Sequence, residues 1–277
     1  MERVKTVNFY PQGSVASGPM QFQQLIASVS SEQRLPIAIG RKVDLNGVGK
    51  EPLHLDLGDL PHLIVKYKNT KFMDRICMSA ALSLMLFNKP KYLQFIVLKK
   101  VYSELEQIET SPFCSLFQSV ENSSYGIVQI INEGKKRRKA MELLGARTVK
   151  TMQNLYLEDP EQYNSRVPSA GASAHHNVIV ILHNIANYIE SQGDAKRLYC
   201  LINDARAQGI NLILGVDQNT TEDFGWVYDS IPAVVTHLEG DFFRFRNFIS
   251  ECLAYSPGIE AKDVDIFFDE IHKKYVQ

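Results

Sequence analysis

The stretch "LPHLIVKYKNTKFMDRICMSAALSLML" (Leu60–Leu86) decides the fold. Its first part, His62–Val65, is short, apolar and partly β-branched, as in strands that are buried inside a sheet. A tight polar connection follows, and then the apolar segment Met73–Phe87, which predicts a buried helix. A strand, a short connection and a helix in this order are typical of a βαβ unit.

The same alternation of strands and helices continues along the chain. The expected elements are the strand Tyr92–Leu98, the helix Asn132–Leu144 before a C-capping Gly145, the strand Asn177–Ile185, the helix Ala195–Gln208 before Gly209, and the strand Ile210–Val216. Strands that alternate with helices of ten or more residues predict an α/β domain, with a mostly parallel central sheet and flanking helices.

The ends of the chain differ from this central part. Residues 1–34 are rich in Gln, Ser and Gly around one short amphipathic piece, Met20–Val29, and are expected to form an arm. An N-terminal hairpin is expected from the strands Leu35–Val43 and Pro52–Leu57 with the turn Asn46–Lys50 between them. Residues 241–277 predict two amphipathic helices divided by Ser256-Pro257-Gly258. The domain between the arm and this C-terminal helical segment therefore covers residues 35–240.

Composition excludes several classes of protein. The chain has 277 residues, 45% of them hydrophobic and 22% charged, and a net charge of −1, so nucleic acid has no global electrostatic attraction to it. Its four cysteines lie far apart and predict neither a disulfide framework nor a metal site. No run of 18 apolar residues and no signal peptide is seen, so we expect a cytoplasmic protein without a membrane span.

Several stretches between Leu35 and Leu238 carry a family resemblance. They are "LPIAIGRKV" with "KEPLHLDLGDLPHLIV", then "SAALSLML", "INEGKKRRKAMELLGARTVKTM" and "LINDARAQGINLILGVDQ". In order and spacing they resemble the motor domain of the FtsK/SpoIIIE DNA translocases. The resemblance implies a RecA-like P-loop NTPase fold.

The position of the phosphate loop departs from the family pattern. The family's G-T-T-G-S-G-K-S falls on Tyr67, Lys68, Asn69, Thr70, Lys71, Phe72, Met73 and Asp74. In a working loop, glycines let backbone N–H groups close around phosphate while a lysine neutralises its charge. Here no glycine is present, and Met73 stands at the lysine position. Asp74 replaces the Mg²⁺-binding serine and would bring negative charge to the start of the helix, where an anion should sit.

Two further motifs of the family are also changed. The family's strand end V-D-E corresponds to His183-Asn184, which supplies neither a carboxylate base nor a good Mg²⁺ ligand. The family's T-Q-R-P corresponds to a segment that contains Asp217-Gln218. Because three separate elements are lost together, the resemblance implies a pseudo-ATPase for which no cofactor is expected.

The roles that remain open belong to three classes. The first is an assembly, regulatory or DNA-associated module that binds related motor subunits or other proteins in a homo- or hetero-oligomer. The second is an active or weakly active ATP-dependent DNA translocase, which would bind ATP and Mg²⁺ and use Lys68 or Lys71 in place of the lost lysine. The third is a nucleic-acid-binding module without ATPase activity.

Basic residues offer candidate contacts. Lys66, Lys68 and Lys71 predict a solvated loop or, as the less favoured alternative, an anion or nucleic-acid contact at a helix N-terminus. The run Lys135, Lys136, Arg137, Arg138 and Lys139 is spread around a helix, which favours a solvated face or a subunit contact over DNA binding. Arg206 keeps the family's "AR-x-x-G" arrangement. It is either an arginine that acts in trans on a neighbour's nucleotide or one partner of a structural salt bridge.

Two other clusters carry no predicted chemistry. His175 and His176 are sequential and would point to opposite faces of a strand, and no carboxylate or cysteine completes a ligand set, so no metal is expected. The acidic residues Glu222, Asp223 and Asp229 near Trp226 have no second feature beside them.

Overall fold

The structure is a computed structural model that describes most of the chain. It covers Phe22, Leu25, Ser28 and Val29 and residues 33–44, 47–99, 105–119, 123–167, 174–220, 224–256, 258–259 and 261–275. Most of the expected arm 1–34, the turn residue Asn46 and the acidic residues Glu222 and Asp223 lie outside these ranges.

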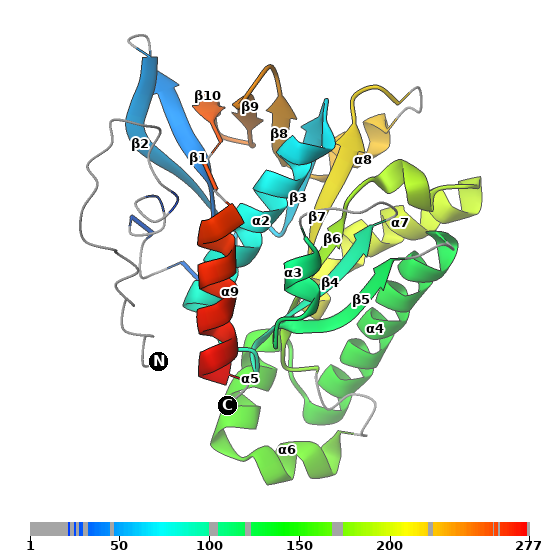
Figure 1. The fold of residues 1–277 in the computed structure, drawn as a ribbon. Helices are drawn as coiled ribbons and strands as arrows, with labels where there is room; N and C mark the ends of the chain where they lie inside the picture. Colours follow the sequence, from blue (N-terminus) through cyan, green and yellow to red (C-terminus); the bar gives the residue numbers. More distant parts are fainter. Residues whose placement is uncertain are drawn as a thin grey trace.

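The described strands form one sheet of ten strands in the order β2-β1-β10-β9-β8-β3-β7-β6-β4-β5 (Figure 1). Their bounds are β1 Pro36–Asp44, β2 Gly47–Asp56, β3 His62–Tyr67, β4 Leu93–Lys99, β5 Cys114–Ser119, β6 Asn177–Leu182, β7 Ile210–Asp217, β8 Ala233–His237, β9 Phe242–Arg246 and β10 Glu251–Tyr255. Pairing is parallel from β8 across to β5. It is antiparallel from β8 across to β2. The expected parallel core and N-terminal hairpin are confirmed.

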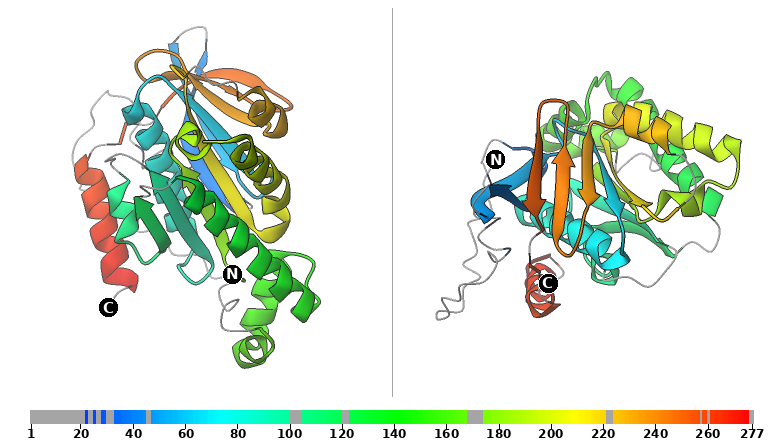
Figure 2. Two further views of the ribbon diagram at one scale, coloured as in Figure 1. Left: turned by 90° about the vertical axis from the view of Figure 1, so that its right-hand side faces the viewer. Right: turned by 90° about the horizontal axis from the view of Figure 1, so that it is seen from above.

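Helices lie on both faces of the parallel part of the sheet (Figures 1 and 2). The described helices are α2 Thr70–Phe87, α3 Glu106–Glu109, α4 Ser123–Leu144, α5 Val149–Glu158, α6 Pro160–Arg166, η2 Ile185–Tyr188, α7 Gln192–Ala205, η3 Arg206–Gln208, α8 Gly225–Ser230 and α9 Ala261–Tyr275. No helix among the described residues combines the length and apolar character that a membrane span needs.

Strand β3 shows why the sheet is covered on both sides. Leu63 and Val65 belong to the cluster that contains α2 and α9, whereas Ile64 belongs to the cluster that contains α4 and α7. Successive side chains of a strand point to opposite faces, so an unbroken apolar run fits a strand that is buried on both faces. The fold class read from Leu60–Leu86 is therefore confirmed.

The C-terminal segment was predicted wrongly. Residues 242–255 form the β9–β10 hairpin rather than an amphipathic helix, and only α9 is helical after it. The prediction overlooked the period of the pattern: Phe243 and Phe245 are buried while Phe242, Arg244 and Arg246 are exposed. Alternation with a period of two is typical of a strand. The hairpin joins β8 to β1, so it continues the sheet of the central domain.

Some helix and strand boundaries also differ from the expectation. Helix α2 begins three residues before Met73, because the Asn69 side chain caps it. Helix α4 begins at Ser123 instead of Asn132. Strand β6 ends at Leu182, and Asn184 caps the 3-10 helix that follows.

Gly209 ends the α7–η3 helical segment, as the sequence predicted. Gly209 has φ +68°, and a Cβ there would lie 2.1 Å from Cγ2 of Val149. A side chain at this position would suffer both an unfavourable backbone conformation and a clash.

Candidate functional site

The candidate site lies where β3 leads into α2. β3 ends at Tyr67 and α2 begins at Thr70, so only Lys68 and Asn69 connect them. The connection lies at the carboxyl edge of the parallel strands, which is where open α/β sheets bind ligands. The end of β7 lies alongside, with Asp217 paired to Tyr67.

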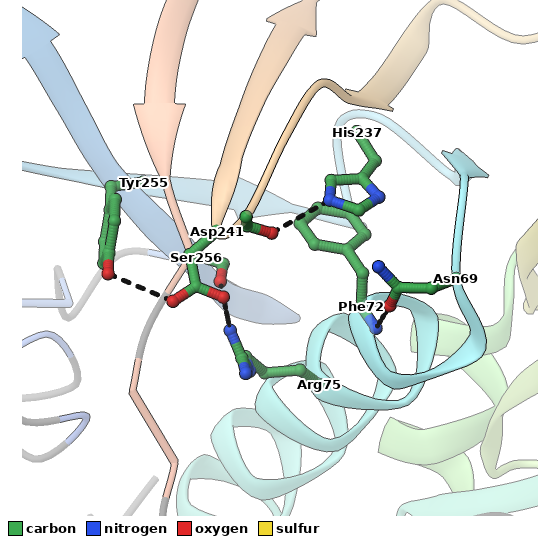
Figure 3. A network of polar contacts seen from close by, with 8 residues as sticks. Asn69, Phe72, Arg75, His237, Asp241, Tyr255 and Ser256 are labelled. Atoms are coloured by element: carbon green, nitrogen blue, oxygen red, sulfur yellow. Dashed lines mark hydrogen bonds and ion pairs between the residues drawn. The ribbon is translucent and has the colours of Figure 1, made fainter.

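Two backbone N–H groups, one in the connection and one in the first turn of α2, are used within the protein. The Lys68 N–H donates to His237 Nδ1 at 3.2 Å. The Phe72 N–H donates to Asn69 Oδ1 at 2.9 Å (Figure 3). In a phosphate loop, donors of this kind point at the ligand. Here they tie the loop to the β8 end and to its own helix cap.

Aromatic packing holds the first turn of α2. The Phe72 ring stacks on the His237 ring with centroids 4.1 Å apart and an interplanar angle of 3°. Because His237 Nδ1 accepts from Lys68, its Nε2 carries the proton and donates to the Gly240 carbonyl at 2.9 Å. The Phe72 side chain is buried, as is Met73, which the resemblance places at the family's lysine position.

Two positions that belong to separate motifs contact each other. His183 Nε2 lies 2.8 Å from Asp74 Oδ1, and both side chains are buried. The contact joins the start of α2 to the end of β6 across 109 residues of sequence. The carboxylate therefore has its hydrogen-bond partner inside the protein, as a buried charged group requires.

The Tyr67 ring lies beside the His183 ring of this pair. Its ring centroid lies 6.0 Å from that of His183. Burial, with a smaller contribution from Asp217, raises the pKa of Tyr67 well above its ordinary value, so the phenol stays protonated. Burial likewise raises the pKa of the Cys77 thiol, so this group stays protonated and unreactive.

Gln218 and Asp217 have structural partners in this arrangement. Gln218 Nε2 donates to the Lys66 carbonyl at 3.0 Å and to the His237 carbonyl at 2.9 Å, so it joins the ends of β3 and β8. Asp217 Oδ1 accepts from both the backbone N–H and the side-chain amide of Asn219, at 2.9 Å each.

A second polar network lies beside the connection (Figure 3). The Asp241 carboxylate accepts hydrogen bonds from Arg75 and from the Tyr255 hydroxyl, the latter at 3.0 Å. Arg75 also donates to Ser256 Oγ at 3.2 Å, and the Ser256 N–H donates to the Asp241 carbonyl at 2.8 Å. The network fixes α2 to the β8–β9 turn and to the end of β10.

The sequence analysis missed His237, Arg75 and Asp241 as members of the site. Lys68 and His237 are 169 residues apart, and Arg75 and Asp241 are 166 apart. No motif or spacing in the sequence identified either pair.

The three lysines near the connection differ in environment. Lys66 Nζ lies 4.3 Å from the centroid of the Tyr228 ring, which is a cation–π contact. Lys68 and Lys71 are exposed.

The expectation for the basic run on α4 is wrong at one position. Arg137 has 1% exposure, so it lies on no solvated face and cannot reach DNA. It pairs with Glu133 at 2.9 Å and donates to the carbonyls of Ala174, His176 and Gln208 at 3.3, 2.5 and 3.3 Å. The other four residues, Lys135, Lys136, Arg138 and Lys139, are exposed, and Arg138 pairs with Asp204 at 3.1 Å.

Arg206 is not brought to the connection within this chain. It is exposed on η3, just before the start of β7, whereas Asp217 ends β7 at the carboxyl edge. Its role in trans stays a prediction.

The two sequential histidines lie in an aromatic cluster. His175 stacks on Tyr156 with centroids 3.9 Å apart and meets Tyr163 edge to face at 5.4 Å. Burial, His175 and Arg137 together lower the pKa of His176 to about 3. In the described ranges no group of three or more metal-ligating side chains is found.

Of the acidic residues near Trp226, the structure describes Asp229, which is exposed on α8.

Comparisons with known proteins agree with the fold. No protein-family model matches the chain. The DNA translocase FtsK of Shewanella oneidensis is 24% identical over 262 residues, which cover 83% of this chain and 28% of that protein. The chain thus spans little more than a quarter of that relative.

Solved structures are similar over most of the chain. The cytoplasmic domain of the type VII secretion ATPase EccC of Thermomonospora curvata has a TM-score of 0.69 at 13% identity, covering 92% of this chain and 34% of that one. ATPases 2 and 3 of EssC from Geobacillus thermodenitrificans give 0.66 at 14% identity, with 90% and 50% coverage. The pCW3 conjugation coupling protein TcpA, solved with ATPγS, gives 0.63 at 13%, with 88% and 71% coverage.

Proposed function

We propose that this chain, a relative of the FtsK/SpoIIIE-type motor domains with their RecA-like fold, is a pseudo-ATPase. It acts as an assembly, regulatory or DNA-associated module of a related motor. The observation that carries the proposal is the occupation of the connection between β3 and α2 by the protein's own groups.

A magnesium nucleotide does not fit the residues of this connection. The N–H groups of Lys68 and Phe72 are bonded to His237 and Asn69, so neither is offered to a phosphate. Asp74, the fifth residue of α2, places a carboxyl group near the start of the helix, where an anion would have to bind. A phosphate there would have to break these bonds and approach a negative charge, so the geometry supports a site without nucleotide chemistry.

A phosphate-release assay tests this function. With ATP and Mg²⁺, in the presence and absence of duplex DNA, the chain is expected to release no phosphate above the protein-free background. Steady DNA-stimulated release would contradict the proposal.

An active translocase is the second candidate, and the exposure of Lys68 and Lys71 beside the connection favours it. If either lysine replaced the missing one, DNA-stimulated phosphate release would be seen and would be abolished by Lys68→Ala or Lys71→Ala. Lys91→Ala, at an exposed lysine outside the connection, is the matched control.

A nucleic-acid-binding module without ATPase activity is the third candidate. It is favoured by the exposed Lys135, Lys136, Arg138 and Lys139 on α4. Binding through such residues releases counterions, so affinity in a gel-shift assay would fall steeply as salt is raised. Changing Lys135 and Lys136 to Ala should weaken that binding, whereas Lys196→Ala on α7 should not.

A further inference from the structure

The outer side of the β9–β10 hairpin concentrates exposed apolar residues. Among the described residues ten large apolar side chains are exposed, and four of them lie in this hairpin: Phe242, Phe248, Ile249 and Leu253. Phe248 and Ile249 are 83% and 94% exposed, so they contribute almost nothing to the packing of the chain that carries them. Grouped apolar exposure of this kind marks a surface that another molecule covers.

The tip of the hairpin is held in one conformation. Asn247 Oδ1 accepts from the N–H groups of Ile249 and Ser250 at 2.9 and 2.8 Å, and the Asn247 N–H donates to the Ser250 carbonyl at 2.9 Å. Phe248 and Ile249 are therefore presented on a fixed turn. A preorganised apolar tip loses little conformational entropy when it docks.

Arginines accompany the apolar residues on the same side. Phe242, Arg244 and Arg246 point outward from β9, and Leu253 and Glu251 lie opposite the two arginines on β10. Glu251 pairs with Arg244 at 3.3 Å, so the surface carries two positive charges and one negative charge. Apolar residues with arginine are the side chains enriched in protein interfaces. We call Phe242, Arg244, Arg246, Phe248, Ile249 and Leu253 the hairpin surface.

The complementary chemistry is present elsewhere on the same chain. At the junction of α5 and α6, Leu157 is 52% exposed and is flanked by the exposed Glu158, Asp159 and Glu161. No lysine or arginine occurs between Thr151 and Ser165. We call these four residues the acidic corner. The acidic corner has one exposed apolar side chain surrounded by carboxylates. The hairpin surface has exposed apolar side chains accompanied by arginines, so the two surfaces are complementary in charge.

The two surfaces cannot meet within one copy. Figures 1 and 2 show β9 and β10 at the top of the molecule and α5 and α6 at the bottom. We propose that the hairpin surface binds the acidic corner of a second copy of this chain, so that copies associate head to tail. Such a contact uses two different surfaces and produces rings or open chains rather than a closed symmetric pair.

Sedimentation velocity tests the proposal on the full chain. The native protein should associate as its concentration rises over roughly 1 to 100 µM. The double variant Phe248→Ser/Ile249→Ser should raise the dissociation constant about tenfold or more. Ile266→Ser, at an exposed position of α9, is the matched control and should associate like the native chain. Both altered surfaces are exposed, so folding, checked by circular dichroism, should be unchanged.

A mixing experiment separates head-to-tail contact from a symmetric one. Glu158→Lys/Glu161→Lys should likewise raise the dissociation constant about tenfold or more, but it keeps an intact hairpin surface, while Phe248→Ser/Ile249→Ser keeps an intact acidic corner. Mixed together, the two variants should form a one-to-one dimer. A native chain that stays monomeric throughout, or variants that fail to complement each other, would overturn the proposal. The hairpin surface shares no residue with the β3–α2 connection, so this result is independent of the nucleotide assays.

Discussion

At the scale of single residues, the contact between Asp74 and His183 is the feature that most affects the site. The resemblance predicted that both positions had changed. The structure brings them together at 2.8 Å in a buried environment. Two positions that the resemblance assigns to separate motifs thus form one satisfied pair.

The pair predicts a specific loss of stability. His183→Ala leaves the Asp74 carboxyl group buried without its partner, which should lower the free energy of unfolding by about 3 kcal/mol. Urea unfolding followed by circular dichroism measures it. Adding Asp74→Ala to the same chain should cost less than the sum of the two single changes. Additive effects, or a loss no larger than that of Asp229→Asn at an exposed position, would show that the contact contributes nothing.

A second residue makes stability depend on pH. Burial lowers the pKa of His62 to about 4 from an unfolded value of 6.5, so below pH 6.5 the unfolded chain takes up a proton that the folded chain does not. Stability should therefore fall as the pH drops from 6.5 towards 4. At pH 5 the protonation of His62 in the unfolded chain should lower the free energy of unfolding by about 2 kcal/mol.

Urea unfolding at pH 7.5 and pH 5 checks this dependence. His62→Asn, whose side-chain oxygen can still accept the hydrogen bond from the Leu212 N–H, should show a smaller difference between the two values. A difference as large as that of the native chain would remove His62 as its source.

At the scale of elements, the sequence predicts best where the period of the pattern is unambiguous. The buried strands and α2 were found from continuous apolar runs. β9–β10 was mistaken for a helix because Phe-Phe-Arg-Phe-Arg is short and its strand partners, β8 and β1, lie elsewhere in the sequence. The sequence predicted which positions near the start of α2 belong to the site, but not the contacts that they make. These contacts join residues that are far apart in the sequence, such as Lys68 and His237, which are 169 residues apart.

The cap of α2 gives a prediction at this scale. Asn69→Ala removes the acceptor for the Phe72 N–H and should reduce stability by about 1 kcal/mol. Asn69→Asp keeps an acceptor and should stay within a few tenths of a kcal/mol of the native value. Thermal and urea unfolding of the three proteins compare them. Equal losses in both variants would mean that the side chain does not act as a cap.

At the scale of the whole molecule, the chain combines a complete RecA-like sheet with a connection that is occupied by its own side chains. The sheet is stabilised by clusters on both faces that need no ligand. A fold can therefore persist through its packing while the chemistry of its site changes. The sequence predicted this architecture, but it gave no sign of the hairpin surface, because the two strands that carry it were read as a helix.

The most direct test of the pseudo-ATPase account is a calorimetric titration of the native chain with ATP and Mg²⁺. The bonds that tie Lys68, Phe72 and Asp74 into the protein predict no saturable heat at nucleotide concentrations up to about 1 mM, a range that spans ordinary enzyme affinities for substrate. Saturable binding of one nucleotide per chain with a dissociation constant in the micromolar range would contradict the account.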